Sequence, residues 1–252
     1  ARQVGLENLN HNKQDIKDEL QSIHDQTIVE GIESLNNLSD QQKESYLQDA
    51  SLILNDAFTT IDNAERNTEL LDTKTQTITA LANLLNAARL EDHKISTSNH
   101  VSQSVDALKD QINEMKHLTE FEKTTLLIQI TDLQDTTNQS INAQSSITDV
   151  DTVFNSFETN LNSILLNAYR QDTKSSLDKT LNELITKVEG YQHITDTEKQ
   201  NKINELTTIV NNSKTQIDQL STTEAIDDRI NKTQQDLNSI IDFLDYKEQV
   251  IQ

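Results

Sequence analysis

A six-residue pattern that occurs three times constrains the fold of this chain more than any other feature. It reads Leu-Ser-Asp-Gln-Gln-Lys at 38–43, Leu-Thr-Glu-Phe-Glu-Lys at 118–123 and Ile-Thr-Asp-Thr-Glu-Lys at 194–199. The lysines that end the three copies are Lys43, Lys123 and Lys199. Three leucines are separated by the same two intervals: Leu81, Leu161 and Leu237. Two independent sets of residues with the same spacing indicate an internal repeat. We therefore predict three tandem units, at 1–85, 86–165 and 166–252.

The chain lacks the residues that usually interrupt helices. Its 252 residues include no proline and only three glycines, where globular proteins average about 5% proline and 7% glycine. Hydrophobic residues make up 33% of the chain, enough for narrow helical stripes but little for one large core. The composition therefore predicts an all-α fold with short connections.

Each copy of the pattern has the form of a helix N-terminal capping box. A Ser or Thr side chain accepts a hydrogen bond from the backbone three residues on, and the Gln or Glu there reaches back. Related pairs precede other apolar runs. The predicted cap residues are Ser39 with Gln42, Thr119 with Glu122, Ser146 with Asp149, Thr195 with Glu198 and Ser221 with Glu224.

Apolar residues at helical spacing divide each unit into three helices. The first helix of unit 1 is predicted from about Val4 to Asn36. Its stripe through Ile16, Leu20 and Ile23 resumes at Ile28 only after a one-residue skip. Gly31 lies within this helix, at a cost of about 1 kcal/mol relative to alanine.

The junctions between units contain neither glycine nor proline and keep their apolar spacing. We predict continuous helices across about 69–116 and 147–189, each serving as the third helix of one bundle and the first of the next. Ser96-Thr97-Ser98-Asn99, a run of poor helix formers, is the weakest point of the first. The first interval between lysines exceeds the second by four residues, which lie between Leu85 and Leu118. The predicted architecture is a spectrin-like rod of tandem three-helix bundles.

The net charge and the lack of known motifs argue against nucleic-acid binding, membrane insertion, metal binding and catalysis. With a net charge of −21, the chain repels nucleic acid and anionic lipid, and no run of 18 apolar residues could span a membrane. There is no cysteine, glycine-rich phosphate loop or calcium-loop motif. His117 and His193 precede caps in different units and are interpreted as exposed loop residues rather than metal ligands. We expect no enzyme activity and no cofactor.

Phe121 is the weak candidate for a binding residue. It is the second residue of its helix, where the other units have Gln41 and Thr197. It either covers the end of the bundle or is exposed.

The repeat resembles the helical repeats of giant staphylococcal cell-wall proteins that bind extracellular matrix. The resemblance lies in 118–123 and 194–199, more loosely around Ser39, and in a spaced run of apolar and acidic residues at Ile141, Ala143, Val150, Asp151, Leu161 and Ile164. It implies a long rod on the bacterial surface, attached to the cell wall elsewhere in a longer chain, with host matrix proteins such as fibronectin as partners. It carries over no functional residues.

Three functions follow as hypotheses. The first is a monomeric spacer segment in such a surface rod, excised from a longer protein. The second is a three-helix binding module for fibronectin, immunoglobulin or albumin, which needs an exposed apolar patch. The third is an intracellular spectrin-like cytoskeletal rod. A wall-sorting signal in the full-length gene would exclude the third.

Overall fold

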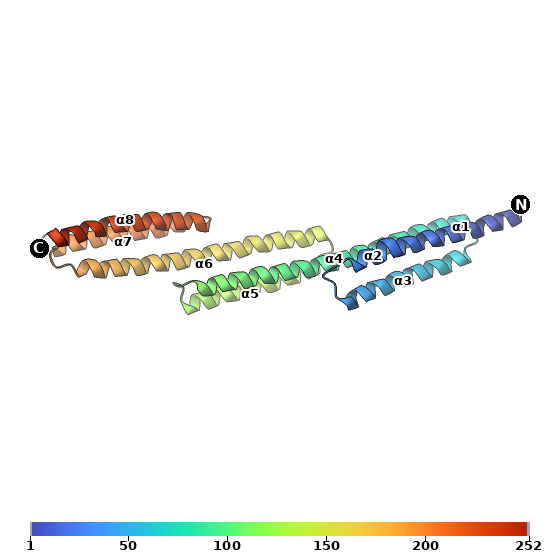
Figure 1. Ribbon diagram of the computed structural model, residues 1–252, viewed down its shortest axis with the longest axis horizontal. Helices are drawn as coiled ribbons and strands as arrows, with labels where there is room; N and C mark the ends of the chain where they lie inside the picture. Colours follow the sequence, from blue (N-terminus) through green and yellow to red (C-terminus); the bar gives the residue numbers. More distant parts are fainter. Residues whose placement is uncertain (1, 251–252) are drawn as a thin grey trace. The chain divides into compact units, whose positions relative to one another are not determined.

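The chain is helical along nearly its whole length (Figure 1). The computed structural model describes residues 2–250, except for the side chains of residues 2–4 and 6. The elements are α1 (Arg2–Ile23), η1 (His24–Val29), α2 (Glu30–Glu33), α3 (Asp40–Asn63), α4 (Asn67–Glu114), α5 (Glu120–Ala143), α6 (Ile147–Glu189), α7 (Asp196–Ile217) and α8 (Thr223–Val250). No strand occurs among the described residues, and the predicted all-α class is confirmed.

Two helices run without interruption across predicted unit boundaries, as expected. They are α4 with 48 residues and α6 with 43 residues. At a rise of 1.5 Å per residue, α4 is about 72 Å long. The run 96–99 stays helical within α4, where Thr97 is buried and the neighbouring Ile95 packs against a core cluster. Tertiary packing thus outweighs the low helix propensity of this run.

The first predicted helix forms one helical run, but its hydrogen-bonding pattern changes from α-helix to π-helix and back. Between α1 and α2, the six residues of η1 form a π-helix, and the helical run ends at Glu33 rather than near Asn36. Buried side chains follow one another at steps of four: Ile16, Leu20, His24, Ile28 and Ile32. An α-helix with 3.6 residues per turn cannot hold so many steps of four on one face, and a π-turn absorbs the surplus residue.

Contacts divide the chain into two compact units, and the first comprises Ala1–Val101 and Thr137–Phe154. Within it, α1, η1 and α2 all pack against α3. One core cluster joins Ile16, Leu20, Leu54, Ala57, Ile61, Ala64 and Leu70, and a second joins Ile28, Ile32, Leu38, Ala50, Leu81, Leu85 and Ala88. Gly31 has a packing role here, because a Cβ at this position would lie 3.0 Å from Leu85 Cδ1.

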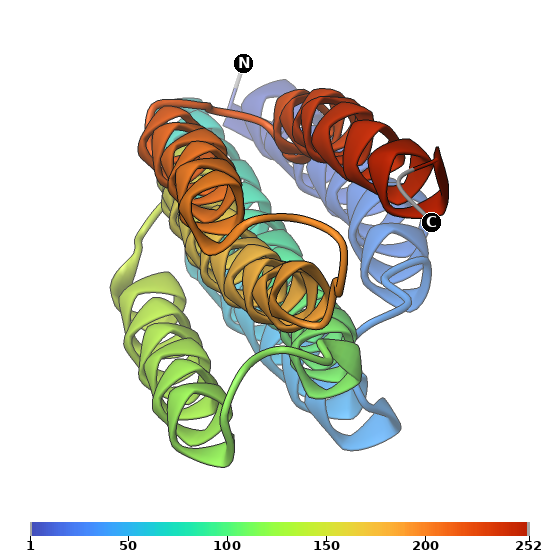
Figure 2. The same ribbon diagram turned by 90° about the vertical axis from the view of Figure 1, so that its left-hand side faces the viewer.

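The second compact unit comprises Ser102–Thr136 and Asn155–Gln252. The later part of α6 lies side by side with α7 and α8 (Figure 2). Their shared core contains Leu177, Leu181, Val188, Leu206, Val210, Ile217, Ile226, Leu237, Ile241 and Leu244. One polar pair interrupts it: the hydroxyls of Ser213 and Thr233 are fully buried and 2.7 Å apart. A mutual hydrogen bond offsets the cost of burying them.

No helix among the described residues is long and apolar enough to cross a membrane.

Candidate functional site

The repeated six-residue pattern folds as a capped helix start. At α3, Gln42 N donates to Ser39 Oγ at 3.3 Å while Ser39 N donates to Gln42 Oε1 at 2.9 Å. At α5, Glu122 N donates to Thr119 Oγ1 at 3.2 Å and Thr119 N donates to Glu122 Oε2 at 2.8 Å. The hydrogen bond from the Thr119 backbone, with a second from its hydroxyl, lowers the pKa of Glu122.

The remaining predicted caps differ in detail. Asp149 N donates to Ser146 Oγ at 3.1 Å, and the Ser146 hydroxyl donates to Asp149 Oδ2 at 2.7 Å. Glu198 N donates to Thr195 Oγ1 at 3.3 Å, while Lys247 Nζ binds the Glu198 carboxylate at 2.5 Å.

The pairing of Ser221 with Glu224 was wrong by one residue. Helix α8 begins at Thr223, and Ala225 N donates to Thr222 Oγ1 at 3.2 Å. Ser221 and Thr222 are both good cap formers, and only the backbone path of the loop decides between them.

The lysine that ends each pattern holds the end of the preceding helical run. Its Nζ donates to a backbone carbonyl ten residues earlier in all three copies: Lys43 to Glu33 O at 2.9 Å, Lys123 to Asn113 O at 2.8 Å and Lys199 to Glu189 O at 3.1 Å. A cation at a helix C-terminus satisfies unpaired carbonyls and interacts favourably with the helix dipole. This role explains why lysine recurs at the repeat spacing.

A carboxylate from a later helix binds the backbone of each loop. Asp92 Oδ1 accepts from Asn37 N at 2.6 Å and Leu38 N at 3.1 Å. Asp172 Oδ1 accepts from His117 N at 2.7 Å and Leu118 N at 3.1 Å.

The third copy uses a glutamate. Glu248 accepts from Gln192 N at 2.6 Å and His193 N at 3.0 Å. Burial opposes ionisation of Glu248, but these two amides and His193 together lower its pKa. We name Asp92, Asp172 and Glu248 the loop carboxylates. Their role was not predicted from the sequence, although they follow one another at the same intervals as the pattern lysines and that spacing could have revealed them.

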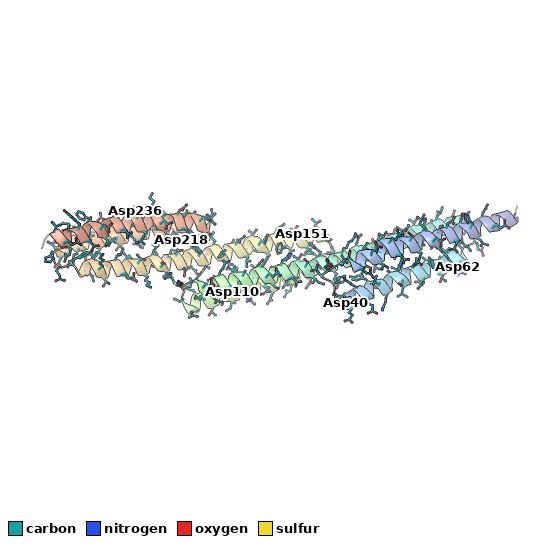
Figure 3. All side chains as sticks on the ribbon, viewed as in Figure 1. Asp40, Asp62, Asp110, Asp151, Asp218 and Asp236 are labelled. Carbon is teal, nitrogen blue, oxygen red and sulfur yellow. The ribbon has the colours of Figure 1, made fainter. Side chains whose placement is uncertain are left out.

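A basic side chain from an earlier helix holds the end of each second helix. Lys13 Nζ donates to Asp62 O at 2.8 Å, and Lys94 Nζ donates to Asn142 O at 2.9 Å. Arg170 donates to Leu220 O in the same way. We name Lys13, Lys94 and Arg170 the helix-end bases. Asp62 and Asp218 are labelled near the ends of α3 and α7 in Figure 3.

Tyrosine hydroxyls add further links between helices. Tyr191 donates to Asp245 at 2.5 Å, and Tyr169 donates to Asp227. Burial first, and then the bound carboxylate, raise the pKa of Tyr169 to about 12. These tyrosines remain neutral donors at physiological pH and therefore act as fixed structural links.

The two loop histidines lie beside the loop carboxylates. His193 Nδ1 is 3.2 Å from Glu248 Oε1, and the His117 ring is half-buried while its backbone N–H binds Asp172. Among residues 2–250, no group of three or more His, Asp or Glu side chains is arranged so that it could hold a metal ion.

Phe121 is 82% exposed at the start of α5 and does not cover the bundle end. It borders an open groove of about 430 Å³ between α5 and α6, lined mainly by polar side chains, among them Gln129, Arg170 and Lys174. Lys174 is paired with Asp218 at 2.7 Å, so its charge is already partly compensated. The groove offers one aromatic ring and several hydrogen-bonding groups, but no nucleophile activated by a neighbouring base.

Comparison with known families agrees with this repeated geometry. The model of the family described as Domain of Unknown Function (DUF1542) matches residues 93–168 and again 169–242, more than half of the chain. The chain belongs to the DUF1542 family. The two DUF1542 matches begin at 93 and at 169, in each case one residue before a helix-end base, Lys94 or Arg170.

Named relatives confirm the resemblance inferred from the repeat. The chain is 26% identical over 225 residues to Extracellular matrix-binding protein EbhA of Staphylococcus aureus strain Newman, covering 88% of this chain and 6% of that protein. It is also 26% identical to Extracellular matrix-binding protein ebh of strain NCTC 8325, covering 88% of this chain and 2% of the relative. The chain thus spans only a small fraction of these relatives. No solved structure matches it.

Proposed function

We propose that this chain is a non-enzymatic spacer segment of a bacterial surface stalk that takes part in adhesion to host extracellular matrix. The observation that carries the proposal is the recurrence of the same links at the repeat spacing, joined by the continuous helices α4 and α6. In such arrays each repeat contacts mainly its neighbours, so length grows with copy number. The names of the staphylococcal relatives support matrix adhesion as the context.

The proposal includes three repeats, at 1–85, 86–165 and 166–252, and a position on the cell surface within a longer, wall-attached protein. Small-angle scattering tests the spacer role directly. We expect a radius of gyration well above the roughly 18 Å of a compact globule of this length. A value as small as that of the globule would contradict the proposal. Accessibility of this segment to antibody on intact cells would separate a surface stalk from an intracellular spectrin-like rod.

A second candidate function is a binding module for a host protein such as fibronectin, immunoglobulin or albumin. It is favoured by Phe121, an exposed aromatic residue at a groove, because aromatic residues including phenylalanine are enriched in protein–protein interfaces. Surface plasmon resonance against each purified protein tests it. Micromolar or tighter binding that Phe121→Ala abolishes and Leu52→Ala preserves would establish this function. Leu52, 60% exposed on α3, is the matched apolar control. A pure spacer shows no saturable binding in either variant.

A further inference from the structure

Each junction helix carries two oppositely charged side chains, two residues apart, that bind different repeats. On α4, Asp92 holds the loop before α3, and Lys94 holds the end of α5. On α6, Arg170 holds the end of α7, and Asp172 holds the loop before α5. In the proposed division into three repeats, the carboxylate binds the loop of the preceding repeat and the base binds the helix end of the following repeat.

The geometry of the α-helix explains this pairing. Residues two apart point about 200° away from each other around the axis, so the two side chains leave the helix on nearly opposite sides and reach different partners. The order is reversed between the junctions: the carboxylate precedes the base on α4 and follows it on α6. The four additional residues of the first junction, about one helical turn, account for this reversal.

We propose that Asp92 with Lys94, and Arg170 with Asp172, form two-way latches that couple the local unfolding of successive repeats. When one of the two charged side chains loses its hydrogen bonds, the junction helix becomes less stable at the position of the other charged side chain. This coupling affects the chain's own stability and does not depend on where the protein resides or what it binds.

The division of contacts supports the latches independently. The boundaries between the two compact units fall at 101/102, 136/137 and 154/155, within the predicted second repeat. Each compact unit therefore contains one whole latch with all its partners.

The end of α8 differs from both junctions and provides an internal contrast. Glu248 holds its loop, but Tyr246 and Val250 occupy the positions two residues before and after it. Their exposed fractions are 65% and 61%. Within the described part of α8, the loop carboxylate therefore has no base two residues away, and the adjacent Lys247 binds Glu198 of α7 instead.

Amide hydrogen exchange of the full chain tests the proposal. Asp172→Ala should increase exchange at His117 and Leu118 about tenfold, the usual scale for losing a hydrogen bond to a charged group. Because of the coupling, it should also increase exchange at 218–222 at least about threefold. Arg170→Ala should show the reverse pattern, with its larger effect at 218–222.

Controls separate coupling from general loss of stability. Asp178→Ala removes a neighbouring carboxylate on α6 that binds Lys214, and should leave His117 and Leu118 unchanged. Arg170→Lys should restore both sites, because Lys94 has this role on α4.

Asp172→Glu provides the sharpest rescue. Because Glu248 binds the amides of Gln192 and His193, this variant should restore protection but move it one residue earlier, to Lys116 and His117. Strictly local effects, with Asp172→Ala changing only the loop and Arg170→Ala only the end of α7, would overturn the proposal.

Discussion

The first helical run and helix α4 both contain surplus residues but absorb them differently. One extra residue between Leu20 and Ile28 becomes a π-turn, whereas four extra residues in α4 leave an unbroken α-helix. The reason is rotation: one residue turns the helix by about 100°, but four residues turn it by about 400°, which returns the buried face to within about 40°. A helix therefore tolerates an added turn and must distort to accommodate an added residue.

The largest expected effect comes from breaking this rule in α4. Inserting one alanine between Ser98 and Asn99 rotates the seam that begins at Val101 and Val105 by about 100° away from its core. We expect a loss of at least about 3 kcal/mol in the free energy of unfolding, measured by urea denaturation. Inserting four alanines at the same place should cost less than half as much. Equal costs for the two insertions would contradict the rotational explanation.

A proline within the regular junction helix α6 should lower the free energy of unfolding strongly. Arg170→Pro should cost about 3 kcal/mol, because proline removes a backbone hydrogen bond and its ring clashes with the preceding turn. Amide exchange should increase in both flanking repeats. Arg170→Ala, which removes the same side chain but keeps the helix, isolates the backbone contribution. Wild-type protection on both sides of the proline would show that the junction is not a shared rigid helix.

Gly31, two residues after the π-turn, tests how closely this part is packed. Alanine improves helix propensity by up to about 1 kcal/mol, but its Cβ would lie 3.0 Å from the packed Leu85 side chain. We expect Gly31→Ala to lower stability by roughly 1 kcal/mol in thermal and urea melts. Gly5→Ala is the matched control, since a Cβ there meets nothing within 4 Å and should be neutral or stabilising. Stabilisation by both substitutions would mean that Leu85 repacks freely.

The smallest effect is expected from removing the surplus residue itself. Deleting the exposed Gln26 from η1 places His24, Ile28 and Ile32 at α-helical steps of three and four. We expect ordinary α-helix in place of the π-turn and a stability change within about 1 kcal/mol. Asp106 is an exposed residue of α4 in a stretch whose buried residues, Val101, Val105 and Leu108, already follow α-helical steps. Its deletion should cost several times more. Comparable losses in both deletions would show that the π-turn is required for packing.

The sequence alone predicted the all-α class, the capped start of α3 and α5 and the continuity of α4 and α6, because these depend on local propensity and on periodicity within one helix. It also contained the one-residue skip at η1, although not how the skip is absorbed. Only the tertiary structure decided what holds successive segments together. The roles of Lys43, Asp172 and Arg170 depend on atoms brought together from 10 to 55 residues away. The shift of the α8 cap from Ser221 to Thr222 likewise depends on the loop path, since neighbouring hydroxyl residues have nearly equal local preference and long-range packing selects between them.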